Sequence, residues 1–221
     1  MKSLNEYILN EVKSNEINYY NKLSMIDKFP SCLFYKGNIN LINSPTLAII
    51  GCRKCSKYGK EVAINLSYRL AKSGMTIISG GARGIDSFSI LGAIAAGKPT
   101  IIVLGNGLNY IYPSENKELE EKVLENGGLL LSEYEVNKKP DKNNFPQRNK
   151  IISAISDGLL IVEAKEKSGT FITVDYALNF GKNIYAIPGN INSKNSFGTN
   201  ELIKQGAKPV TRIQDILEDF Y

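Results

Sequence analysis

Residues 47–86 constrain the fold more than any other part of the chain, because they contain two successive apolar runs that each end in a tight turn. The first run, residues 47–50, is rich in branched residues and stops at Gly51, as a strand buried on both faces would. A basic turn and an amphipathic helical stretch follow it. The second run, residues 76–79, leads into the glycine-rich turn 80–84 and a further helix. This pattern predicts parallel strands joined by helical crossovers.

Both turns place glycine and arginine where parallel strands end. Arg53 and Lys54 lie in the first turn, and Gly80, Gly81 and Arg83 lie in the second. Backbone amides and helix N-termini gather at that edge of a sheet, so an anion is the expected ligand. Glycine alone would also suit any tight exit from a strand. The arginines inside both turns favour phosphate binding, since a guanidinium matches a phosphate with two parallel hydrogen bonds.

The same strand and helix rhythm continues to the end of the chain. Further strands are predicted at residues 100–104, 129–132, 159–163 and 184–187, and helices at 148–156, 170–180 and 200–205. We therefore predict an α/β fold with a doubly wound, mostly parallel sheet and helices on both faces. Residues 46–221 would form this extended Rossmann-like domain. Residues 1–45 would be a lead-in, helical over 1–28, with an edge strand at 33–35.

A polar loop predicted over residues 135–150 carries the second candidate feature. Five cations share this stretch with Phe145, namely Lys138, Lys139, Lys142, Arg148 and Lys150. Cations interleaved with an aromatic ring suit single-stranded nucleic acid, in which phosphates pair with charge and a base stacks on the ring. A solvated loop whose phenylalanine packs into the core explains the pattern equally well. The residues alone leave both readings open.

A third turn, around Ser168 and Gly169, precedes the helix predicted to begin at Thr170. The simpler interpretation is that Ser168 or Thr170 caps this helix. A phosphate held there would use the same amides. The first two turns do not match the GxGxxG or Walker A patterns, which argues against ordinary dinucleotide and ATP sites.

Composition narrows the function classes. The net charge is +5, which permits a nucleic-acid partner, and histidine is absent, which removes the commonest general base and metal ligand. Three cysteines and no signal peptide favour a reducing, cytoplasmic compartment. Cys52 and Cys55 form a CxxC spacing that lacks a second pair, so we expect no metal and no cofactor. No apolar run is long enough for a membrane span, so no membrane partner is expected.

Several motifs together resemble the DprA/Smf family of bacterial DNA-processing proteins. They follow one another at family-like spacing over residues 20–210 and read SGGARGID (79–86), LGNGLNYIYPSEN (104–116), LLLSEY (129–134), NFPQRNKIISAISDGLLIVEA (144–164), KSGTFIT (167–173) and GTNELIKQGAKPV (198–210). The resemblance implies a Rossmann-like core, without the winged-helix domain of many members, that binds single-stranded DNA in natural transformation. It also implies a homodimer and RecA as a partner.

The resemblance assigns roles to individual residues. Arg53 and Arg83 match the family's basic pocket residues, and Lys142 and Phe145 match its lysine and aromatic contacts. Arg148 matches the arginine of the PxRN motif. For the homodimer, the matching segment offers the apolar pair Leu202 and Ile203, which could equally be core.

We expect a DNA-binding protein with no catalytic step. The enzymatic alternative is a Rossmann-like nucleotide phosphoribohydrolase, whose signature PGGxGTxxE has a catalytic glutamate. Here the corresponding turn reads EKSGTFIT and places Thr173 at that position. Asp86, Glu133 and Glu163 lie near strand ends and could be acids or bases, or could cap turns and pair with arginines. A nucleotide-sensing module is the remaining alternative.

Overall fold

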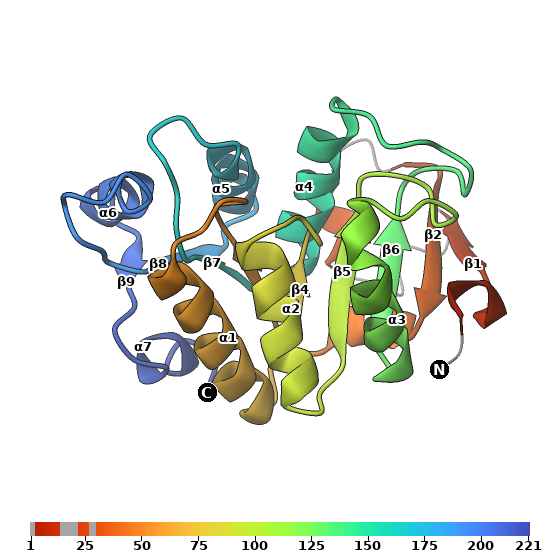
Figure 1. Ribbon diagram of the computed structural model, residues 1–221, viewed down its shortest axis with the longest axis horizontal. Helices are drawn as coiled ribbons and strands as arrows, with labels where there is room; N and C mark the ends of the chain where they lie inside the picture. Colours follow the sequence, from red (N-terminus) through yellow and green to blue (C-terminus); the bar gives the residue numbers. More distant parts are fainter. Residues whose placement is uncertain (1–2, 14–21, 27–29) are drawn as a thin grey trace.

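The computed structural model describes residues 3–13, 22–26 and 30–221. Within them a nine-stranded sheet has the order β1-β2-β6-β5-β4-β3-β7-β8-β9 (Figure 1). Its parallel part comprises β3 Thr46–Ile50, β4 Thr76–Ser79, β5 Thr100–Leu104, β6 Leu129–Ser132, β7 Gly158–Ile161, β8 Asn183–Ala186 and β9 Lys208–Pro209. The chain winds outward from β3 in both directions, so the predicted doubly wound fold is confirmed.

Helices cover both faces of the sheet. Figure 1 shows α1 Lys57–Lys72, α2 Ile85–Ala95 and α3 Lys117–Glu125 across one face. The opposite face carries α4 Asn144–Ile155, α5 Thr170–Asn179 and α6 Phe197–Lys204. Leu47 and Ile49 of β3 pack in the cluster under α1, while Ala48 and Ile50 pack in the cluster under α4 and α5. This alternation is what a strand buried on both faces requires.

The lead-in differs from the prediction. Its described part holds the short 3-10 helices Leu4–Glu6 and Leu23–Met25, and also a strand, β1 Asn10–Lys13, where only helix was expected. The rest of the expected helical region, residues 1–2, 14–21 and 27–28, lies outside the described residues. β2 Cys32–Gly37 is the predicted strand, but it pairs with β1 on one side and β6 on the other, so it is not an edge. The sequence did not predict β1, because Val12 is the one buried residue of this strand.

The start of α4 is the most consequential difference. The helix begins at Asn144 rather than at Arg148, so Phe145 is a helical residue and not part of a loop, and Arg148 lies one turn into the helix rather than at its start. Pro146, which was read as loop sequence, sits in the first turn, where a helix tolerates proline because the amide there has no helical partner. The shift turns Phe145 and Arg148 toward the carboxyl edge of the sheet.

The C-terminal elements also need small corrections. α6 begins at Phe197, three residues before the prediction, and a last short helix, α7, spans Gln214–Leu217. Before this helix the Asp215 carboxylate accepts the Thr211 amide at 2.8 Å. Among the described residues no helix has the length and apolarity that crossing a membrane would take.

Candidate functional site

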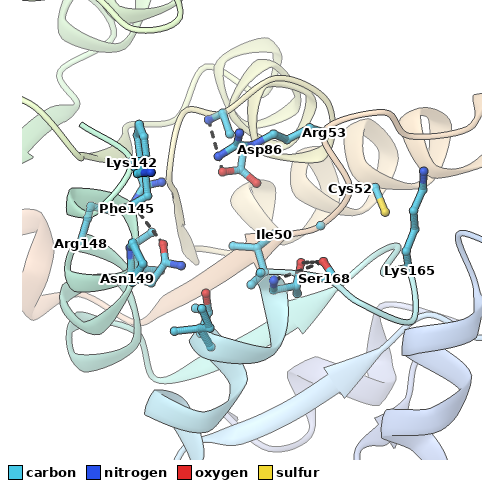
Figure 2. Close-up of a pocket in the computed structure, with 18 of the residues that line it drawn as sticks. Ile50, Cys52, Arg53, Asp86, Lys142, Phe145, Arg148, Asn149, Lys165 and Ser168 are labelled. Atoms are coloured by element: carbon cyan, nitrogen blue, oxygen red, sulfur yellow. Dashed lines mark hydrogen bonds between the residues drawn. The ribbon is translucent and has the colours of Figure 1, made fainter. Parts of the chain in front are cut away.

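A cavity of about 630 Å³ opens at the carboxyl ends of β3 and β7, between α4 and the start of α5 (Figure 2). A second cavity, of about 360 Å³, adjoins it around the turn after β4 and the loop after β5. All ten residues predicted from the sequence line one or both of them. Arg53, Lys54, Phe145 and Arg148 line both, Lys142, Ser168 and Gly169 line the first, and Gly80, Gly81 and Arg83 line the second.

The turn that carries Arg53 is fixed by backbone contact with the turn after β4. The Ile85 amide donates to the Cys52 carbonyl at 3.2 Å. Gly84, at φ 81°, lies so close that a Cβ atom on it would be 2.3 Å from the same oxygen. Only glycine fits this approach and this conformation. The turns after β3 and β4 are therefore held against each other, and Arg53 projects from a fixed backbone.

Glu163 holds the same turn from the side of β7. Its carboxylate accepts the Ser56 amide at 2.9 Å, the Ser56 hydroxyl at 2.5 Å and the Asn195 side-chain amide at 3.1 Å. The side chain is buried, and Gly59 in the first turn of α1 leaves the room for it. The structure thus gives Glu163 the turn-capping role, one of the two roles that the sequence left open.

Arg148 is buried rather than presented to solvent, with a relative exposure of 5%. Its Nη1 donates to the carbonyls of Gly80 and Val103, and its Nε donates to Asn149 Oδ1 at 3.1 Å. Burial lowers the pKa of Arg148 to about 10, which leaves it cationic at neutral pH. The expectation that Arg148 is free to bind a phosphate is therefore wrong. This arginine links α4 to the ends of β4 and β5.

Asp86 supplies the counter-charge for Arg148. It lies buried at the first turn of α2 and accepts the Ala82 amide at 3.3 Å. Burial raises the pKa of this carboxyl, while the charges of Arg148 and Arg53 act in the opposite direction. Its surroundings are those of a structural carboxylate that stabilises the turn after β4.

Phe145 stands at the mouth of both cavities, half-buried against Gly105. The guanidinium of Arg53 lies 5.7 Å from the centre of its ring, and the ring of Tyr112 lies 5.5 Å away at an angle of 32°. Tyr112 is 43% exposed and was not singled out from the sequence. The sequence did contain a signal for Tyr112, because this residue is an aromatic side chain in the loop that follows a predicted strand. The result is an aromatic pair beside an exposed arginine.

Exposed cations surround the larger cavity. Lys54 and Lys142 were predicted from the sequence. Lys165 and Lys167, in the turn before α5, also line the cavity and were not predicted. Lys142 and Lys165 are labelled in Figure 2. Arg83 is mostly exposed at the second cavity, where it pairs with Glu115. Such an exposed ion pair contributes little to stability.

The N-cap of α5 is Gly169, so neither Ser168 nor Thr170 caps the helix as predicted, although Ser168 makes a local hydrogen bond at the helix start. The Thr170 amide donates to the Ser168 hydroxyl at 3.2 Å, and that hydroxyl contacts Thr170 Oγ1 at 2.9 Å. A Cβ atom on Gly169 would meet no atom within 4 Å, so open space lies beside this helix start. Cys52 and Cys55 are free thiols, and the described residues contain no group of three or more side chains placed to hold a metal ion.

The fold and the site together define a doubly wound α/β protein whose strand ends carry a basic, aromatic-lined cavity, the arrangement of an anion- or nucleotide-binding protein. Comparison with known sequences identifies the family. The model of the family described as DNA recombination-mediator protein A matches residues 11–221. The chain belongs to this family of DNA-processing proteins, and the resemblance to DprA/Smf proteins is confirmed.

Individual relatives agree with this assignment. DNA processing protein DprA of Streptococcus pneumoniae is 41% identical over 198 residues, which cover 90% of this chain and 70% of that protein. An X-ray structure of DprA from the same species has a TM-score of 0.89 at 37% identity and covers 99% of this chain and 76% of that one. DNA processing protein A from Helicobacter pylori, whose structure concerns its single-stranded DNA binding mode, has a TM-score of 0.86 at 32% identity, covering 97% and 96%.

The curated relatives are longer than this chain. It spans 51% of Protein Smf of Escherichia coli and 64% of DprA of Bacillus subtilis, against 70% of the pneumococcal protein. The likeness to the Helicobacter pylori structure extends over nearly all of both chains. The shared part is therefore the Rossmann-like unit that contains the two cavities.

Proposed function

We propose that this protein binds single-stranded DNA across the carboxyl edge of its sheet, without a catalytic step. The observation that carries the proposal is the placement of Phe145, half-buried at the mouth of both cavities with Arg53 and Tyr112 against its ring. Aromatic platforms flanked by cations bind strands with little sequence preference, since every base has a face to stack. The Helicobacter pylori relative, named for single-stranded DNA binding, supports the same ligand class.

The two kinds of contact should separate by their salt dependence. Each cation that neutralises a phosphate adds roughly 0.7 to the slope of log affinity against log salt for a single strand. Stacking adds affinity, about 1–3 kcal/mol per base, and leaves that slope nearly unchanged. Arg53 contributes to the first kind, Phe145 to the second, and the exposed lysines around the larger cavity add to the first.

The test measures the affinity of labelled oligo-dT by fluorescence anisotropy across a salt series. Arg53→Ala and Lys142→Ala should each weaken binding and flatten the slope by about one phosphate contact. Phe145→Ala should cost about 1–3 kcal/mol at an unchanged slope. Arg69→Ala is the matched control, because Arg69 is exposed in the last turn of α1, away from the strand ends. Binding that survives both cation variants in folded protein would contradict the site.

The absence of nucleotide hydrolysis is also a proposal. Thr173 stands where the phosphoribohydrolase signature has its glutamate. The carboxylate of Glu163 already accepts hydrogen bonds from Ser56 and Asn195. Incubation with AMP should release no free adenine. Release that disappears in Glu133→Gln would instead support an enzyme, since Glu133 Oε1 is buried without a partner among the described residues.

The homodimer is also a proposal. Of the two expected interface residues, Leu202 is buried in the core beneath α6, and Ile203 is partly buried against the same cluster. Phe197, at the start of the same helix, is 50% exposed. If the protein is a homodimer that uses this segment, Phe197→Asp should give a monomer by light scattering, whereas Leu202→Asp should unfold the chain. RecA as a partner and a cytoplasmic location rest on the sequence predictions.

A further inference from the structure

The turn between β3 and α1 contains two thiols to which the proposed DNA site assigns no role. Cys52 comes two residues after the end of β3, Cys55 directly precedes Ser56, the N-cap of α1, and both cysteines are free. A CxxC spacing between a strand and the helix of a βαβ unit is typical of a redox-active pair. The described residues contain no group of three or more metal-ligating side chains, so a metal site does not explain this pair.

The backbone on both sides of the two thiols is fixed. The Cys52 amide donates to the Glu163 carbonyl at 2.9 Å, and the Ile85 amide donates to the Cys52 carbonyl at 3.2 Å. Further along, the Asn195 side-chain amide donates to the Lys54 carbonyl at 3.1 Å. The two residues between the thiols form a turn, and the end Cα atoms of a four-residue turn lie within about 7 Å of each other. A disulfide needs Cα atoms about 4.4–6.8 Å apart, so side-chain rotation with little backbone change can close it.

The two thiols differ in their access to solvent. Cys52 is 6% exposed and its thiol lies next to the backbone of Lys165 (Figure 2). Cys55 is only half-buried. Burial and the Glu163 carboxylate raise the pKa of both thiols. Thiolates are therefore scarce at neutral pH, which excludes a fast catalytic pair. It also favours an uncharged disulfide over the thiolates that its reduction would release.

We propose that Cys52 and Cys55 form a redox modification site whose oxidant is a small disulfide. The half-buried Cys55 attacks first, as a thiolate, at one sulfur of the small disulfide. This step releases one small thiol and leaves a mixed disulfide on Cys55. The Cys52 thiolate then attacks Cys55 Sγ, which forms the internal disulfide and releases the second small thiol. The two protein thiols lose two electrons and two protons, and the two released thiols carry both.

The internal disulfide closes a ring around Arg53 and Lys54. Closure draws the ends of this turn together, and it moves Arg53 relative to the ring of Phe145, whose centre lies 5.7 Å from the guanidinium. Loss of this cation and aromatic contact should lower the affinity for single-stranded DNA by about twofold to fivefold, and reduction should restore it. This consequence rests on the proposed function, whereas formation of the disulfide does not.

The test incubates reduced protein with oxidised glutathione, blocks the remaining thiols with iodoacetamide and digests the product with trypsin. Trypsin cleaves after Arg53 and Lys54, so the internal disulfide joins two peptides that are otherwise separate, and mass spectrometry detects them. Wild type should give the joined peptides, dithiothreitol should separate them, and Cys55→Ser should not form them. Cys32→Ser is the matched control. Cys32 lies on β2, with three strands of the sheet between it and β3, so this variant should oxidise as wild type does.

The outcomes separate the redox chemistry from DNA binding. The site would be overturned if folded wild-type protein failed to give the joined peptides, or if it kept a glutathione adduct on Cys55 beside an alkylated Cys52. An unchanged affinity of fully oxidised protein for oligo-dT would overturn the effect on Arg53. Cys55→Ser should bind oligo-dT equally before and after treatment. If the disulfide forms while no form of the protein binds oligo-dT, the proposed function fails and the redox site stands.

Discussion

Arg148 is a buried charged residue that supports the candidate site from beneath Phe145. It lies under the platform, with its guanidinium 5.9 Å from the ring centre of Phe145 and its donors directed at the ends of β4 and β5. A buried arginine is stable only where carbonyls and a carboxylate surround it, and here Gly80, Val103 and Asp86 provide them. Its effect on DNA binding should therefore pass through the position of Phe145.

Gly80 is the residue on which this arrangement depends most closely. A Cβ atom at position 80 would lie 2.6 Å from Arg148 Nη2. Gly80→Ala should displace the guanidinium and destabilise the protein by about 2–3 kcal/mol, measured by urea unfolding. Gly169→Ala is the matched control, because a methyl group there meets nothing within 4 Å. Equal stability of the two variants would contradict the role given to Gly80.

At this scale the sequence pointed to residues that lie around the same pair of cavities, but it did not indicate the burial of Arg148. All ten predicted residues line the two cavities because glycines and cations at strand ends are local signals. The burial of Arg148 is not a local property. It depends on carbonyls from two strands that are distant in the sequence, so the residue alone reads as an exposed cation.

At the scale of the elements, the turn between β3 and α1, called the junction here, is stabilised by Glu163, which follows β7. Glu163 stabilises it through Ser56 and Asn195, and these contacts bring together three segments that are far apart in the chain. The junction carries Arg53. Loss of Glu163 should therefore disturb a side chain that it does not touch.

Glu163→Ala tests this indirect effect. It should lower the free energy of unfolding by about 1–3 kcal/mol and also weaken DNA binding. Removal of a negative charge near a DNA site should by itself strengthen binding. Glu166→Ala, an exposed position in the same turn, provides that comparison and should leave the affinity equal or higher. Stronger binding by Glu163→Ala would show that the junction does not need this carboxylate.

A buried pair joins the lead-in to α3. Lys36 of β2 donates to the Leu4 carbonyl at 3.0 Å and interacts with the carboxyl of Glu120, and both side chains are buried. Burial raises the pKa of Glu120 from 4.5 to about 8. The folded protein then keeps a proton that the unfolded chain loses, so stability should fall as the pH rises through this window.

Glu120→Gln should remove that dependence. As the pH rises from 5 to 8, the free energy of unfolding of the variant should increase relative to that of wild type. The relative increase should be at least about 1.4 kcal/mol, the free energy that corresponds to one unit of pKa. Thermal unfolding at several pH values measures it. Glu121→Gln, at the adjacent and more exposed position, should follow the wild-type profile. A Glu120→Gln profile parallel to that of wild type would contradict the raised pKa.

The elements of the core were predictable because their periodicity is strong, and the marginal ones were not. β4, β5 and β6 occupy the residues expected from apolar runs bounded by glycine. β1 has one buried residue, and its strand conformation comes from pairing with β2. The first turn of α4 contains Pro146, and the sequence does not show that it lies at a position where proline is tolerated.

For the whole molecule, the position of β3 decides where ligands can bind. β3 lies between β4 and β7, and the helices after β3 and β7 leave on opposite faces of the sheet. A crevice therefore opens at the strand ends, as in other doubly wound sheets. The sequence predicted this edge from the order of strands and turns. The lead-in strand β2 was predicted, but β1 and the antiparallel pairing of both strands with the sheet were not, and this part of the sheet lies away from the crevice.

The pairing of β3 with β7 also governs when the cavity can exist. Leu47 pairs with Gly158, and the far wall, from Lys165 to Thr173, follows β7 in the chain. A ribosome-bound chain that ends after β6 already contains both arginine turns but lacks that wall. Contacts so distant in sequence form late, because a long loop must close first. Affinity for DNA should thus arise only after residues 165–173 have been translated, and a product that ends before them would retain the basic turns without the ability to bind a strand.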